Sequence, residues 1–178
     1  DVQWVKWVHP RIPPATTSFE KKMNAVVASI IPIHCAKCLN MNGCCFAENK
    51  CPEEKFHDNC HCKTERIENL TVKAECPIEK FTEYIFNDFY KDGKEQIFKN
   101  LGYTISDSAT LKSEMEKQAY SAYLSGEYEL GTLDSYGQRI NIYVTLTSKN
   151  GKQVTFKTGW MTYPDGKILL TTPFGGKV

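Results

Sequence analysis

The cysteines and histidines in the first half of the chain have the spacing of metal ligands. Cys35 and Cys38 form a Cys-x-x-Cys pair, and His57, Cys60 and Cys62 follow them closely. A tight turn after such a pair brings two sulfurs to one ion, and zinc accepts Cys and His in a tetrahedral site. We therefore predict a structural zinc site held by Cys35, Cys38, Cys60 and either His57 or Cys62.

The same residues allow other interpretations. Eight cysteines are an even number, and small cysteine-dense modules are often held by disulfides, which would give Cys51 and Cys76 a partner. Catalysis by a reactive cysteine is a further alternative. A zinc enzyme would need an open site, whereas closely spaced cysteine ligands favour closed structural ones. Its candidate residues are His34, His57 and His61, with Glu48, Glu53 or Glu54 as the base.

A second polar group lies nearer the C-terminus, and its residue types suit the binding and cleavage of a phosphodiester. Arg139 has the planar fork that clamps phosphate oxygens, and Lys157 would stabilise the developing charge. Tyr143 would stack on a base or transfer a proton, with Glu129 as the candidate general base. Asn141 and Thr171 would orient the substrate.

The helices that support this group are expected directly after Pro77. Ile78, Phe81, Ile85 and Phe89 recur on one helical face. A second helix is predicted over residues 93–101, ending at Gly102. A third is predicted from an N-cap at Asp107 or Ser108 to Gly126. Its apolar side carries Leu111, Met115, Ala119 and Ala122.

From residue 127 the pattern alternates, which predicts a four-stranded antiparallel meander. Three turns end in glycine, at Gly137, Gly151 and Gly166, as three-residue hairpin loops require. With such loops Leu146 pairs with Val154, Val144 with Phe156, Ile140 with Trp160 and Trp160 with Leu170, while Tyr128 and Leu130 face Val144 and Ile142. The predicted core face comprises Tyr128, Leu130, Ile140, Ile142, Val144, Val154, Phe156, Trp160, Ile168 and Leu170.

This register places the six polar candidates together on the opposite face of the sheet. Tyr143 is then opposite Lys157, and Asn141, Gly159 and Thr171 form a row beside them. A strand glycine often marks the close approach of a ligand. However, a solvated polar face is also the ordinary outcome for an antiparallel sheet.

Two resemblances follow from these residues. The run from Cys35 to Gly43 (Cys-x-x-Cys-x-x-x-Asn-Gly), with the later His57-x-x-Cys60-His61-Cys62, resembles the C-terminal signature of phage minor head (Mu F-type head-morphogenesis) proteins. That motif usually ends His-Pro-Asn-Cys-Arg-Cys, so Asp58 and His61 depart from it. In prophage polymorphic toxins a variable toxin domain follows such a segment, and this resemblance implies delivery by phage or secretion from a bacterium and action in the target-cell cytoplasm.

The second resemblance concerns the helices followed by the sheet, an α+β plan similar to the barnase/EndoU/colicin/RelE class of small ribonuclease toxins. The stretches Gly93-Lys94, Leu101-Gly102-Tyr103 and Thr171-Thr172-Pro173 are similar to an uncharacterised domain at toxin C-termini. The expected partners are RNA or tRNA and a cognate immunity protein. The domain carries no histidine, so a non-enzymatic head-associated or protein-binding module with a zinc knuckle is the alternative.

Composition sets the outer bounds. The chain has 178 residues, a net charge of +1 and no run near the ~20 apolar residues that cross a bilayer. We also expect no signal peptide at the start of the sequence. All cysteines and histidines precede residue 77, so we predict a Cys/His-rich segment with an extended N-terminal arm over residues 1–76 and an α+β domain over residues 77–178. Residues 134–178 hold six basic and two acidic side chains, which favours an anionic substrate.

Overall fold

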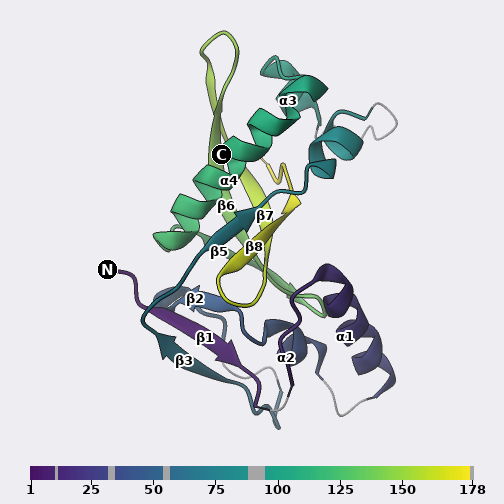
Figure 1. The fold of residues 1–178 in the computed structure, drawn as a ribbon, viewed down its shortest axis with the longest axis vertical. Helices are drawn as coiled ribbons and strands as arrows, with labels where there is room; N and C mark the ends of the chain where they lie inside the picture. The colour runs from purple at the N-terminus through teal and green to yellow at the C-terminus, as the bar shows by residue number, and fades with distance from the viewer. Residues whose placement is uncertain (11, 32–34, 54–56, 88–94, 177–178) are drawn as a thin grey trace.

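The computed structural model describes residues 1–10, 12–31, 35–53, 57–87 and 95–176 and has a mixed α+β fold, as predicted. A three-stranded sheet of order β2-β1-β3 and a five-stranded sheet of order β4-β8-β7-β6-β5 share one apolar core. Figure 1 shows α4 crossing the larger sheet, with the smaller sheet, α1 and α2 below it. The strands are β1 (Trp4–Val8), β2 (Cys45–Ala47), β3 (Lys63–Ile67), β4 (Lys73–Glu75), β5 (Glu129–Asp134), β6 (Gly137–Thr147), β7 (Gln153–Thr162) and β8 (Lys167–Thr172). The helices are α1 (Ser18–Ile30), α2 (Ala36–Met41), α3 (Glu95–Asn100) and α4 (Ser108–Leu124), with the short turns η1 (Glu48–Lys50), η2 (Lys80–Ile85) and η3 (Ile105–Asp107). No helix in the described ranges is both long and apolar enough to span a bilayer.

The start of the chain, residues 4–8, is part of a sheet, and the predicted extended arm around Pro10, Pro13 and Pro14 stays a prediction. These residues form β1, the central strand of the small sheet, which pairs antiparallel with both β2 and β3. The reason is burial of Trp4 and Trp7 in the common core. Trp4 packs edge-on against Tyr123 of α4, with ring centroids 5.1 Å apart, so β1 is held by the second half of the chain.

The meander of β5 to β8 is confirmed, with changes of register in β5 and between β7 and β8. The pairs Val144–Phe156 and Trp160–Leu170 are as predicted, because three-residue loops end at Gly151 and Gly166. The β5–β6 loop instead has two residues, since Asp134 pairs directly with Gly137. An irregularity in β5 follows, and Leu130 pairs with Ile140 rather than Ile142.

Leu130 is also a correction to the predicted core face, because 42% of it is exposed. It lies on β5, the edge strand, whereas α4 packs against β6 and β4. The other predicted core positions are buried except Val154, which is half-buried. The fifth strand, β4, pairs in parallel with β8 and was not predicted.

The helices match the predicted positions in part. α4 begins at Ser108 and buries Leu111, Met115 and Ala119 as expected. The first predicted helix is a short π-helical turn, η2, which buries Phe81 and Ile85. Phe89 of the first predicted helix and residues 93–94 of the second lie outside the described residues. The second helix is α3, which ends at Asn100, one residue earlier than predicted. The boundary after residue 76 stays a prediction, although β4 precedes it and joins the later sheet.

A prediction about stability arises at the β7–β8 turn. Gly166 has φ +81°, and an added Cβ would lie 2.6 Å from the Thr71 carbonyl oxygen. We expect Gly166→Ala to lower the free energy of unfolding by about 3 kcal/mol, from the left-handed backbone and the clash together. Gly151→Ala is the matched control: φ is +89° but nothing lies within 4 Å, so about 1 kcal/mol is expected. Equal losses in urea unfolding would contradict the role of the close approach.

Candidate metal centre and cationic pocket

Two overlapping groups of thiols and imidazole lie around Cys38. The ligand atoms of Cys35, Cys38 and His57 lie within 4.8 Å of one another, and so do those of Cys38, Cys60 and Cys62. The Cys38 Sγ is 3.3 Å from His57 Nε2 and 3.5 Å from the Cys60 Sγ. All five residues predicted as ligands are therefore brought together, and these groups could hold a metal ion.

Local structure explains this convergence. Cys35 is the N-cap of α2 and Cys38 lies three residues on, so both side chains lie on one face of the helix. The Cys60 amide donates to the His57 carbonyl oxygen at 3.1 Å, closing a turn that brings this histidine to the same point. Cys62 immediately precedes β3, which pairs with β1, so the small sheet fixes the second ligand segment.

Hydrogen bonding gives the thiols of this cluster different pKa values. The bond with Cys38 lowers the pKa of Cys62 to about 6, helped by Trp7 and Cys60, while the same bond raises the pKa of Cys38. The lowered pKa favours the thiolate form of Cys62, which is the form that binds metal.

The remaining cysteines belong to neither ligand group; they are Cys44, Cys45, Cys51 and Cys76. All eight cysteines lie in described residues and none is in a disulfide bond, so the structure does not support the disulfide alternative. Burial raises the pKa of Cys44 and Cys76, and that of Cys45 to about 12. Such thiols stay protonated and are poor nucleophiles.

The second site lies on the open face of the larger sheet, which brings four of the six polar candidates into one row. Tyr143 pairs with Lys157 and Asn141 with Gly159, as predicted. The Tyr143 hydroxyl donates to Glu129 Oε2 at 3.1 Å, and this bond raises the pKa of Tyr143. Both side chains are exposed, so the pair is accessible to a ligand.

Gly159 has a structural explanation besides the predicted approach of a ligand. A Cβ there would lie 3.2 Å from the Thr172 Cβ and 3.4 Å from the Thr171 Oγ1. An irregularity between Gly159 and Trp160 pairs Gly159 with Thr172 rather than with Thr171. The glycine is therefore explained by the close approach of β8.

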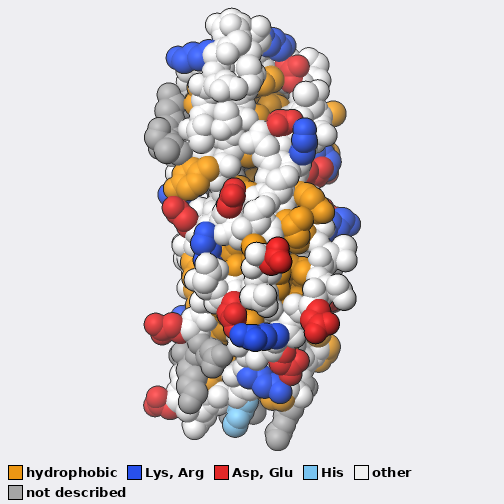
Figure 2. Space-filling model, turned by 90° about the vertical axis from the view of Figure 1, so that its left-hand side faces the viewer, with side chains coloured by type: hydrophobic (Ala, Val, Ile, Leu, Met, Phe, Trp, Pro, Cys, Tyr) orange, Lys and Arg blue, Asp and Glu red, His pale blue; other side chains and the backbone are white. Residues whose placement is uncertain are grey.

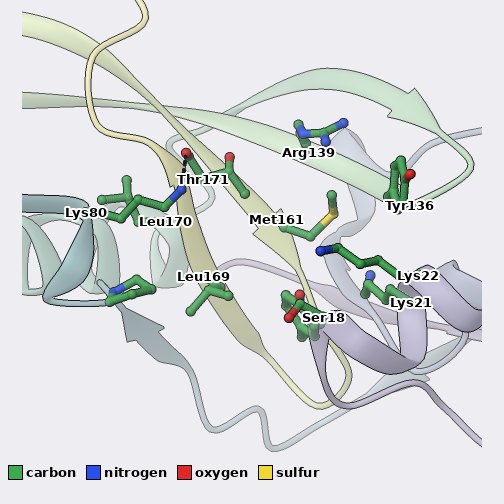
Figure 3. A pocket seen from close by; sticks show the side chains of 12 residues that line it. Ser18, Lys21, Lys22, Lys80, Tyr136, Arg139, Met161, Leu169, Leu170 and Thr171 are labelled. Atoms are coloured by element: carbon green, nitrogen blue, oxygen red, sulfur yellow. Dashed lines mark hydrogen bonds between the residues drawn. The ribbon is translucent and has the colours of Figure 1, made fainter. Parts of the chain in front are cut away.

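Arg139 and Thr171 lie next to these residues and line a cavity of about 380 Å³. The cavity is formed between the sheet, the start of α1 and η2. Figure 3 shows Lys22 and Lys80 extending toward its middle from opposite sides, with Met161 between them. Its lining comprises Ser18, Lys21, Lys22, Pro77, Lys80, Tyr136, Arg139, Met161, Tyr163, Leu169, Leu170 and Thr171.

Charge gathers in this cavity, which we call the cationic pocket. Arg139 reaches it from β6 and is held by an ion pair with Asp134. Lys80 donates to the Thr171 carbonyl oxygen at 3.0 Å, and burial lowers its pKa. Lys22 is exposed at the rim. On the face seen in Figure 2, by contrast, acidic and basic side chains are interspersed along the molecule.

Lys21 lies beneath the pocket and is only 2% exposed. Its Nζ donates to the carbonyl oxygens of Asn40 at 2.9 Å and Thr162 at 2.7 Å, and lies 4.6 Å from the ring centre of Tyr163. Burial lowers the pKa of Lys21. This lysine links α1, the metal-binding segment and β7.

Of the residues that line the pocket, only Arg139 and Thr171 were predicted as site residues; those missed include Lys21, Lys22, Lys80 and Tyr136. No sequence signal identifies them, because α1 and η2 approach Arg139 only through the tertiary fold. The polar alternation of β6 identified Arg139 alone.

The comparisons with known proteins agree with the fold. A family model described as a domain of unknown function (DUF6883) matches residues 66–174. The chain belongs to this family. The DUF6883 match spans all five strands of the larger sheet and includes Lys80, Arg139 and Thr171, whereas the five cluster ligands precede it. No curated protein and no solved structure gives a significant match. The predicted similarity to an uncharacterised domain is thereby confirmed in its coarse form.

Proposed function

We propose that the DUF6883 domain is a metal-independent ribonuclease acting on RNA or tRNA, with its site at the cationic pocket. The observation that carries this proposal is the convergence of Lys22, Lys80 and Arg139, from three separate elements, on one open cavity. A phosphodiester needs such fixed positive charge, and Arg139 offers it in a planar fork. Tyr136, at the same cavity, is suited to stacking on a base.

The proposed reaction is attack of a ribose 2′-oxygen on the adjacent phosphorus. A bond forms between the 2′-oxygen and phosphorus, the bond to the 5′-oxygen breaks, and the 2′-hydroxyl proton passes to a base while the leaving oxygen gains one. Lys22, Lys80 and Arg139 stabilise the charge on the phosphate oxygens. The predicted row of Glu129, Tyr143, Asn141 and Lys157 continues along the same sheet face and guides the strand, with Glu129 as the candidate base.

For the N-terminal cluster we propose a structural zinc ion. Thiolates and imidazole are the donors that zinc prefers, and a buried Cys38 shared by both groups suits a closed site. Cys35, Cys38 and Cys60 would be three ligands, with His57 or Cys62 as the fourth. When bound, zinc crosslinks α2 to the segment before β3 and supplies no chemistry to the distant reaction.

In this proposal the chain is the effector part of a phage-encoded or secreted polymorphic toxin. The Cys/His segment derives from a phage minor head protein, delivery is by phage or secretion, and RNA is cut in the cytoplasm of a target bacterium. A cognate immunity protein would cover the cationic pocket. The support is the Cys/His motif together with the position of the DUF6883 domain after it.

The test is incubation of the purified protein with total bacterial RNA and with tRNA in excess EDTA. We expect cleavage to persist under chelation and to fall at least about 100-fold, about 2.7 kcal/mol, in Arg139→Ala, because it removes stabilisation of transition-state charge. Lys80→Ala should behave in the same way. Lys152→Ala, at the β6–β7 loop, is the control, and Lys157→Ala reports on the sheet row.

The second candidate function is a non-enzymatic RNA- or protein-binding module. It is favoured by the absence of histidine after residue 61 and by the neutralising Asp134 beside Arg139. Retained RNA binding by filter assay, with no cleavage in EDTA or with zinc, would support this module and reject the ribonuclease. Cleavage that Arg139→Ala leaves intact would reject the pocket as its site.

A further inference from the structure

Helix α1 exposes its largest apolar side chains to solvent, while its side toward the protein carries Lys21 and Asn24 beside the small or β-branched residues Ala25, Val27 and Ala28. The side that contacts the rest of the chain carries the buried Lys21 and the half-buried Asn24, whose amide nitrogen donates to Asn40 Oδ1 at 2.9 Å. Four apolar side chains project outward, Phe19 (68% exposed), Met23 (43%), Val26 (49%) and Ile30 (72%). A helix normally buries its apolar stripe, whereas this surface, the α1 stripe, is left uncovered by the residues that the structure describes.

The spacing of the α1 stripe is symmetrical. Its residues follow one another at intervals of four, three and four, so they lie along one helical face. If a second α1 packs against it antiparallel, Phe19 lies opposite Ile30 of the second copy, and Met23 lies opposite its Val26. Each contact then occurs twice about a twofold axis, as an isologous interface requires.

The charge and the area of the α1 stripe are both compatible with binding of a second copy of this chain. None of the four stripe residues is charged, and the exposed Lys22 lies at the edge of the stripe, where its amine can stay in solvent when two copies pair. The Glu20 carboxylate beside it is already bound to the amides of Thr16 and Thr17. With Ile31, 42% exposed, the stripe offers on the order of 500 Å² per copy, and two copies reach about 1,000 Å², the lower end for specific interfaces.

We propose that the chain forms a twofold dimer through antiparallel pairing of two α1 helices. The antiparallel arrangement also places each helix N-terminus beside the C-terminus of its partner, which favours the two helix dipoles. Because Ser18 and Lys22 of the same helix line the cationic pocket, each pocket borders the dimer interface. This inference does not depend on the ribonuclease proposal.

Sedimentation equilibrium of the full chain, from 1 to 200 µM, tests the dimer. We expect the wild type to dimerise in this range and Phe19→Ser/Ile30→Ser to weaken association at least tenfold. Ile105→Ser, at an exposed apolar residue of η3, is the matched control and should dimerise as the wild type does. Circular dichroism verifies that each variant is folded.

The register has a test of its own. Met23→Lys and Val26→Glu should each weaken the dimer, since each places charge against an apolar side chain. The double variant should recover association, because each lysine then faces a glutamate of the second copy. Failure of the double variant to recover would overturn antiparallel pairing, as would a monomeric wild type at 200 µM.

Other occupants of the stripe give different results. A wild-type monomer that floats with vesicles of phosphatidylcholine and phosphatidylserine would overturn the dimer and assign the stripe to a lipid surface. A monomer that does not float would overturn it in favour of another protein. RNA cleavage is measured on the same samples, and its presence or absence does not alter the conclusion about the dimer, since the stripe variants retain Lys80 and Arg139.

Discussion

Cys38→Ser is expected to remove bound metal almost completely and to destabilise the chain strongly. Cys38 is the one residue common to both ligand groups, so its loss leaves neither group intact. A metal held at about 1,000 times its dissociation constant contributes about 4 kcal/mol to the free energy of unfolding. Because Cys38 and Met41 of α2 lie in the common core, we expect this loss to appear in global unfolding and not only in the N-terminal segment.

The measurement is metal content by atomic emission, paired with urea unfolding before and after chelation. The wild type should carry one zinc per chain and lose about 4 kcal/mol on chelation, whereas Cys38→Ser should lose little more. His61→Gln is the control, since this exposed histidine lies between two ligands but belongs to neither group. Stoichiometric zinc in Cys38→Ser would reject the site, and equal metal loss in His61→Gln would reject this ligand set.

The fourth ligand follows from the same measurement. His57 is exposed and Cys62 is buried beside Trp7, yet both lie within ligand distance of Cys38. Whichever of His57→Gln and Cys62→Ser retains stoichiometric zinc identifies the residue that is not a ligand. The sequence spacing alone admitted both residues.

The sequence predicts the meander well because its loops and alternation agree. The three-residue loop ending at Gly151 leaves one register that keeps Ile142, Val144 and Phe156 on the same face, and the structure has that register. The sequence does not predict the pairing of β5. A two-residue loop and an irregularity shift the register there, and neither feature alters the alternation of apolar and polar residues. The sequence does not predict β4 either, because a strand of three residues that pairs in parallel is too short to show an alternating pattern.

The two candidate sites also differ in how far the sequence predicts them. The metal cluster is predictable because its ligands are chemically distinctive and close in sequence. The cationic pocket is not, because Lys22 and Lys80 are ordinary lysines whose position depends on α1 and η2. α1 itself is missed because its one fully buried side chain is a lysine and its largest apolar side chains face outward, unlike the usual amphipathic pattern.

Lys21 is the buried lysine on the side of α1 that faces the protein. We expect Lys21→Ala to lower the free energy of unfolding by about 4 kcal/mol. The change leaves the buried carbonyl oxygens of Asn40 and Thr162 without their donor, at about 1–3 kcal/mol each, and opens a cavity. Gly137 shows how closely the site is fitted, since a Cβ there would lie 2.9 Å from the Lys21 Nζ. Lys21→Met should cost less, about 2–3 kcal/mol, because its side chain fills the space without donating.

The pH dependence of stability distinguishes the contribution of the Lys21 amine from that of the packing of its side chain. Burial lowers the pKa of Lys21 below its ordinary value of 10.5, so the unfolded chain binds more protons between the two values. The contribution of Lys21 to stability therefore rises with pH up to about 10.5, and the difference in unfolding free energy between wild type and Lys21→Met should widen over that range. Lys22→Ala, one residue away and exposed, should change stability by less than about 0.5 kcal/mol at any pH. A Lys21→Met variant as stable as the wild type, with a parallel pH profile, would show that the two carbonyl contacts contribute nothing and that α1 is held by its remaining contacts alone.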